Sequence, residues 1–207
     1  MTTSIPLRQP MSHFRPPTTL HLVPPSPLSG RAATLEPASW SACAGALVGF
    51  GSSGPDPTRS TFNARSETLT RSDLWRVPLH KRRCLVPISG FFAWRKPDKV
   101  PFRFTLRDEP LYALAGLWDA WKNPAGDWLQ SFSIITVDAS AAMSTIHDRM
   151  PAILMPPEYD QWLDRGETER PPTHLLRPYP ETTLQIHPAN PKVGNVRNQG
   201  IDLLDSP

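Results

Sequence analysis

The sequence predicts an α+β fold that is rich in β-structure, with a sheet or barrel of short antiparallel strands and small helices packed outside it. Prolines make up 26 of the 207 residues, and their number excludes long helices. Short apolar or alternating segments recur along the chain with turn residues between them, which is typical of strands. Seven tryptophans indicate a real core or a stacking surface. The length fits one domain with an irregular region attached.

Residues 1–60 differ in composition from the rest of the chain. They hold ten of the prolines, no lysine and two acidic residues, Glu36 and Asp56. We expect residues 1–60 to form a divergent, Pro-rich N-terminal region that is partly disordered, with short strands at 20–23 and 45–50. The folded domain is expected to span residues 61–207.

The elements of this domain are predicted in chain order. The polar run 63–68 is expected to open a helix that continues to Trp75. Strands are expected at 83–88, 90–95, 100–106 and 112–118, followed by a turn at 123–126 and a strand at 132–137. Asp138 precedes Ala-Ser-Ala-Ala-Met and is expected to be the N-cap of a short helix. A tight polar segment at 146–149, an apolar run at 150–154, a helix at 157–163 that starts with proline, and a strand at 183–187 complete the series.

Charge and motifs exclude several classes. The formal net charge of +3 permits an anionic partner without requiring one. Cys43 and Cys84 lie far apart, so neither a zinc site nor a disulfide framework is indicated, and we expect Cys84 to be a buried thiol in a cytoplasmic protein. No apolar run spans a bilayer, and the N-terminus lacks a secretory signal. No GxSxG, HExxH, P-loop or GxGxxG motif occurs.

Three polar clusters lie between apolar segments, where a packed domain needs a reason to place them. Together they supply three arginines, a histidine and three amides, a set that suits a phosphodiester backbone. The alternatives are structural: a capped or self-paired turn for the second cluster and a solvated tail for the third. The clusters are Asn63/Arg65/Glu67, His147/Asp148/Arg149 and Asn195/Arg197/Asn198.

An aromatic group precedes the basic pair Arg95-Lys96. Trp94 and its neighbours Phe91 and Phe92 are candidates for base stacking. The alternative is ordinary core packing, which we favour for at least one phenylalanine because strand alternation buries one face.

Four ordered segments resemble the SOS response-associated peptidase family of abasic-site processing proteins. They cover about two thirds of the chain, and FNARSE and IHDRMP are the most diagnostic. The segments are FNARSETL (62–69), RRCLVPISGFFAWRK (82–96), IHDRMPAIL (146–154) and HPANPKVGNVRNQG (187–200).

The resemblance implies a channel for single-stranded DNA and a covalent reaction with abasic sites. In the family, a cysteine after the initiator methionine condenses with the ring-opened sugar aldehyde to form a thiazolidine, and the proteins are thought to remove their own N-terminal residue. The resemblance makes Asn63 and His147 catalytic and makes Arg65, Arg149 and Trp94 DNA contacts. Arg197 is expected to join them.

Two positions depart from the family pattern. Met1-Thr2-Thr3-Ser4 stands where the family has Met-Cys-Gly-Arg, and Ala93 stands where it has glutamate. Three hypotheses follow: a binder and sensor of abasic single-stranded DNA whose crosslinking is lost or impaired, an active enzyme with a misassigned start, or a non-catalytic scaffold. We expect a monomer that needs no cofactor or metal, contacts no membrane and associates with the nucleoid in the cytoplasm.

Overall fold

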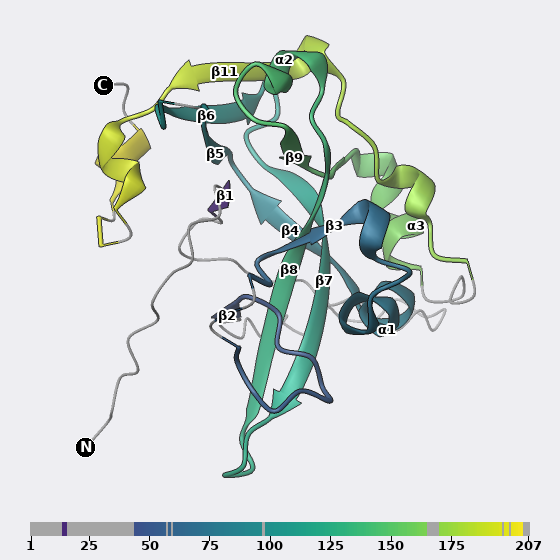
Figure 1. The fold of residues 1–207 in the computed structure, drawn as a ribbon. Coiled ribbons are helices and arrows are strands. Elements are labelled where there is room, and N and C mark those ends of the chain that lie inside the picture. The colour runs from purple at the N-terminus through teal and green to yellow at the C-terminus, as the bar shows by residue number, and fades with distance from the viewer. Residues whose placement is uncertain are drawn as a thin grey trace, which may run out of the picture.

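Two β-sheets form the frame of the molecule (Figure 1). The computed structural model describes residues 14–15, 44–56, 58, 60–96, 98–164, 170–195, 197–198 and 200–204. In the smaller sheet every neighbouring pair is antiparallel. Its strands, in spatial order, are β1 (Phe14–Arg15), β5 (Phe91–Trp94), β6 (Pro101–Leu106) and β11 (Leu184–Pro188).

The larger sheet is built on one long antiparallel hairpin, β7 (Tyr112–Lys122) and β8 (Trp128–Asp138). Two strands pair antiparallel with β7, and these are β4 (Arg83–Ile88) and β10 (Ile153–Leu154). Strand β9 (Arg149–Pro151) pairs antiparallel with β8, whereas β2 (Ala44–Gly45) and β3 (Asn63–Arg65) pair parallel with it. The sheet is therefore mixed.

The helices are short and lie beside the sheets. The α-helices are α1 (Asp73–Lys81), α2 (Ala141–Ser144) and α3 (Tyr159–Leu163). The 3-10 turns are η1 (Ser66–Thr68), η2 (Pro156–Glu158), η3 (Thr173–Leu175), η4 (Glu181–Thr183), η5 (Pro191–Gly194) and η6 (Ile201–Leu204). The β-rich α+β class predicted from the sequence is confirmed.

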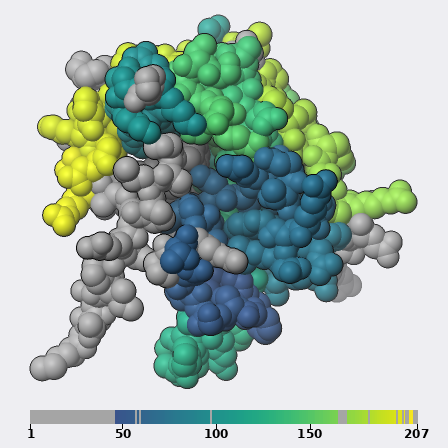
Figure 2. Space-filling model, viewed as in Figure 1, coloured from purple at the N-terminus to yellow at the C-terminus, as the bar shows by residue number. Residues whose placement is uncertain are grey.

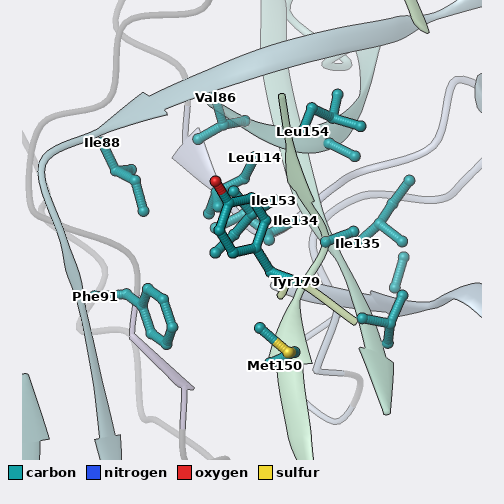
Figure 3. Close-up of a cluster of buried hydrophobic side chains, with 14 of the residues drawn as sticks. Val86, Ile88, Phe91, Leu114, Ile134, Ile135, Met150, Ile153, Leu154 and Tyr179 are labelled. Carbon is teal, nitrogen blue, oxygen red and sulfur yellow. The ribbon is translucent and has the colours of Figure 1, made fainter. Parts of the chain in front are cut away.

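The core lies between the strands of both sheets. Figure 3 shows side chains of β4, β7, β8, β9 and β10 gathered with Phe91 of β5 and with Tyr179. The rings of Phe91 and Phe104 stack with centroids 5.0 Å apart. Phe91 is thus the core member of the aromatic group, as alternation predicts, while Phe92 and Trp94 are half-buried. Cys84 is also buried, as expected.

The strands predicted from alternation are confirmed, and the hairpin strands are longer than predicted. The predicted helix from residue 63 to Trp75 is wrong, because Asn63–Arg65 forms β3 and pairs with Ile134–Thr136. A partner some seventy residues away decides this segment, so its local helix pattern is overridden. The helix begins later, at Asp73, and continues through Pro78 to Lys81.

Asp138 is not a helix cap, contrary to the prediction. It ends β8, and Ser140 occupies the N-cap position of α2. Its carboxylate instead accepts a hydrogen bond from Arg149 Nη1 at 2.6 Å. The helix predicted at 157–163 is present as η2 followed by α3.

Residues 44–56, N-terminal to the predicted boundary, contact the larger sheet. Val48 N–H donates to Ser131 Oγ at 2.8 Å, and Phe50 N–H donates to a carboxylate oxygen of Asp119 at 3.1 Å. Of the strand expected at 45–50, Gly45 belongs to β2, and residues 46–50 are a loop. The strand expected at 20–23 lies outside the described residues, and the boundary at residue 60 stays a prediction.

No helix within the described ranges is both long enough and apolar enough to cross a membrane.

Arg83 fastens two helices to the larger sheet. Its side chain is buried, with a relative exposure of 4% for the residue. The guanidinium donates to Leu79 O (2.8 Å) at the end of α1 and to Trp162 O (2.6 Å) and Asp164 O at the end of α3. A cation is favourable where helix carbonyls lack partners. Arg83 thereby fixes both helix ends against β4.

We expect Arg83→Met to lower the free energy of unfolding by about 3 kcal/mol, because several buried carbonyls would lose a charged donor. Urea unfolding followed by tryptophan fluorescence measures the change. Arg76→Met is the matched control, since Arg76 is an exposed arginine on α1. Equal losses in the two variants would contradict this role for Arg83.

Candidate nucleic-acid site

Arg149 joins two of the three polar clusters. Its Nη2 donates to Glu67 at 2.8 Å and to Thr136 O at 2.7 Å, and its Nη1 donates to Asp138. The side chain is only 17% exposed. Strand β9, the end of β8 and turn η1 are therefore held together by one guanidinium.

The surroundings of His147 allow its ring to gain or lose a proton without moving. Its side chain is 13% exposed, and Nδ1 lies 3.1 Å from Asp148 Oδ1 and 3.1 Å from Arg149 O. The backbone N–H of Arg149 approaches the same nitrogen at 3.0 Å. A bare Nδ1 can accept from this N–H, and a protonated Nδ1 can donate to the carboxylate. Both states have a partner, which suits proton transfer by the imidazole.

Lys96, in the turn after β5, contacts the segment that contains His147. Its backbone N–H donates to Ile146 O at 3.3 Å, and its Nζ lies 3.3 Å from Asp148 Oδ1. On the face seen in Figure 2, the teal surface of the turn after β5 adjoins the green surface of α2 and the residues after it. Slight burial acts to raise the pKa of Asp148, but Lys96 and His147 outweigh it, so this pKa lies below its usual value.

Asn63 presents an unused acceptor in the site. Its Oδ1 is buried and accepts no hydrogen bond from the residues that the structure describes. Leaving a buried acceptor without a hydrogen bond costs roughly 1–3 kcal/mol of stability. A donor on a bound ligand would remove this cost. Arg65, two residues on, is exposed and pairs with Thr136, the residue whose carbonyl receives Arg149.

Trp94 and the C-terminal cluster lie beside each other. A Cβ added to Gly194 would lie 3.9 Å from Trp94 Nε1, so η5 runs against this half-buried ring. Arg197 is exposed, and its backbone N–H donates to Asn195 Oδ1. Ala93 is buried, with 1% exposure, and its methyl side chain supplies no acid group at this position.

The self-paired turn considered for the second cluster is wrong, because Arg149 pairs with Glu67 and Asp138 rather than with Asp148. The contact between Lys96 and Asp148 was missed, because residues 52 positions apart give no sequence signal. Thr2 and Cys43 lie outside the described residues. Within the described ranges, no three His, Cys, Asp or Glu side chains gather as a metal site.

Comparisons with known proteins show the family of the chain. A family model described as SOS response associated peptidase (SRAP) matches residues 15–196. The chain belongs to this family. The match includes Arg15 of β1, the whole of β2, the loop at 46–56, the first two polar clusters and Asn195 of the third, so the family pattern extends N-terminal to residue 61.

Curated relatives and a solved structure are similar to this chain. The abasic site processing protein YoqW of Bacillus subtilis is 35% identical over 151 residues, which are 70% of this chain and 66% of that protein. The abasic site processing protein HMCES of Xenopus tropicalis is 37% identical over 171 residues, covering 70% of this chain and 50% of HMCES. A crystal structure of a Bacteroides thetaiotaomicron protein has a TM-score of 0.73 and 28% identity, covering 80% of this chain and 76% of its own. The matched region is thus less than two thirds of each of the two curated proteins.

The Glu67–Arg149 ion pair leads to a prediction about how stability depends on pH. Partial burial acts to raise the pKa of Glu67, but a backbone hydrogen bond and Arg149 outweigh it, so the pKa is lowered. The stability that this pair contributes is therefore complete above the usual glutamate pKa and is lost as the pH falls through the lowered one. We expect the NMR titration midpoint of the Glu67 carboxyl carbon to lie below that of a peptide glutamate and to rise in Arg149→Gln. An unchanged midpoint in the variant would show that Arg149 does not hold this carboxylate.

Proposed function

We propose that this chain binds single-stranded DNA and recognises abasic sites in the response to DNA damage. The observation that supports this most strongly is the convergence of β3, the segment 146–149 and the end of β5 on one end of β8, linked through Arg149 and Asp148. The similarity to proteins named abasic site processing proteins supports the abasic site as the proposed lesion.

Arg65 and Arg197 are the proposed phosphate contacts, because both are exposed and neither forms an ion pair with another residue that the structure describes. Arg149 differs from Arg65 and Arg197, because both of its Nη atoms already donate hydrogen bonds to acceptors within the protein. A phosphate would have to replace Glu67 or Asp138, both of which are more exposed than Arg149. Trp94 offers a ring face for an unstacked base beside the lesion.

His147 is the proposed acid–base group for opening the abasic sugar to its aldehyde, with Asn63 orienting the reacting end. The family glutamate position, occupied by Ala93, supplies no carboxylate. We therefore propose that formation of a stable thiazolidine crosslink is impaired in this chain while recognition of the lesion is retained.

The test is fluorescence anisotropy with three labelled oligonucleotides: single-stranded with one abasic site, intact single-stranded, and intact duplex. We expect the abasic strand to bind most tightly and the duplex most weakly. Arg65→Ala should weaken binding of both single strands and reduce the salt slope of log K by about 0.7, the value of one phosphate contact on a single strand.

Arg76→Ala is the matched control, because it removes an exposed arginine from α1. It should leave both affinity and salt slope unchanged. Equal affinity for all three oligonucleotides, or no binding at low salt, would overturn the proposed function. An Arg65→Ala protein with the affinity and slope of the unmodified protein would overturn only the phosphate assignment.

A further inference from the structure

Lys96 offers a primary amine beside the proposed acid–base histidine. Its Nζ lies 3.3 Å from Asp148 Oδ1 and 3.4 Å from Oδ2. The same Oδ1 lies 3.1 Å from His147 Nδ1. Amine and imidazole therefore share one carboxylate oxygen, which gives a proton on the amine a short route to the ring.

The amine is also accessible. The Lys96 side chain is 52% exposed and that of Asp148 is 69% exposed, whereas His147 is 13% exposed. The backbone bond from Lys96 to Ile146 fixes where the side chain starts. Trp94, the proposed stacking residue, lies two positions earlier, so an unstacked base and the amine would lie on the same stretch of chain.

We propose that Lys96 forms a reversible imine with the ring-opened aldehyde of an abasic site. This inference rests on the proposed function, since it requires the lesion to enter the site. It gives the site a covalent step that depends neither on the N-terminal residue nor on a carboxylate at position 93. The ligand class is an aldehyde on a single-stranded phosphodiester backbone.

The step balances without an oxidant or reductant. The Lys96 ammonium first gives a proton to the Asp148–His147 pair, and the neutral Nζ adds to C1′ of the sugar. A C–N bond forms, the C=O π bond breaks, and the carbonyl oxygen takes that proton from the imidazolium. The nitrogen then gives its second proton to the imidazole, which passes it to the hydroxyl, and the hydroxyl leaves as water. Loss of the last proton from nitrogen to solvent gives the neutral imine, so ammonium and aldehyde give imine, water and one proton.

Other lysines in the described ranges are placed differently. Lys122 lies over the Trp128 ring at 5.8 Å, at the opposite end of the β7–β8 hairpin. Lys99 lies on the same turn as Lys96, with its backbone N–H bonded to Arg95 O. Lys99 is therefore the stringent control for a lysine that is merely near the site.

The test is borohydride trapping, which reduces an imine to a stable amine. The protein is incubated with single-stranded DNA that contains one abasic site, treated with sodium borohydride and run on a denaturing gel, and the linked residue is found by peptide mass spectrometry. We expect a shifted band linked through Lys96. Lys96→Arg, which keeps the charge beside Asp148, should lose at least nine tenths of the band, and Lys99→Arg should keep it.

The outcomes separate the two proposals. If the protein binds the abasic strand but gives no trapped band, or if the link maps to another amine, the Lys96 proposal is overturned and the proposed function stands. A trapped band of unchanged yield in Lys96→Arg overturns it as well. If the protein binds no single-stranded DNA, both proposals fail. A Lys96→Arg protein that keeps its affinity for intact strands but loses the band supports the amine role over a structural one.

Discussion

The arrangement of the site depends on the contacts of one guanidinium. Arg149 starts on β9, crosses the end of β8 and reaches η1, so it sets the spacing of three segments that are distant in the sequence. Its partners are partly exposed, whereas the guanidinium is mostly covered and its Nε is buried without an acceptor among the described residues. A covered charge of this kind is tolerated where its partners compensate it. Contacts within the protein therefore set the geometry of the site.

A second charge network, around Asp148, completes the site. Asp148 lies between a lysine from the turn after β5 of the smaller sheet and a histidine from the segment before β9 of the larger sheet, so the carboxylate connects segments that flank the two sheets. The two networks differ in what they leave accessible. Around Arg149 the cation is covered and the anions face solvent, which suits a structural link. Around Asp148 both the lysine and the carboxylate are exposed, which suits chemistry on an incoming strand.

Local patterns in the sequence predicted the strands, the burial of at least one of Phe91 and Phe92, and the burial of Cys84, because alternation depends only on near neighbours. They failed at Asn63–Arg65 and at Asp138, whose conformations follow from pairing with β8 and from Arg149. The residues of the clusters could be named from the sequence. That the clusters lie together was expected only from the family resemblance, because parallel strand pairing and the Lys96–Asp148 contact leave no local signal in the sequence. The chemical roles of these residues remain predictions.

Amide hydrogen exchange tests most directly the central claim that this end of β8 receives the lesion. The protein would be measured alone, with an intact single strand and with a strand that contains an abasic site. The account predicts slower exchange with the abasic strand in peptides that cover residues 62–68 and 146–151, and no change in the hairpin tip at 121–129. Slower exchange confined to the hairpin tip, while the strand is bound, would contradict it.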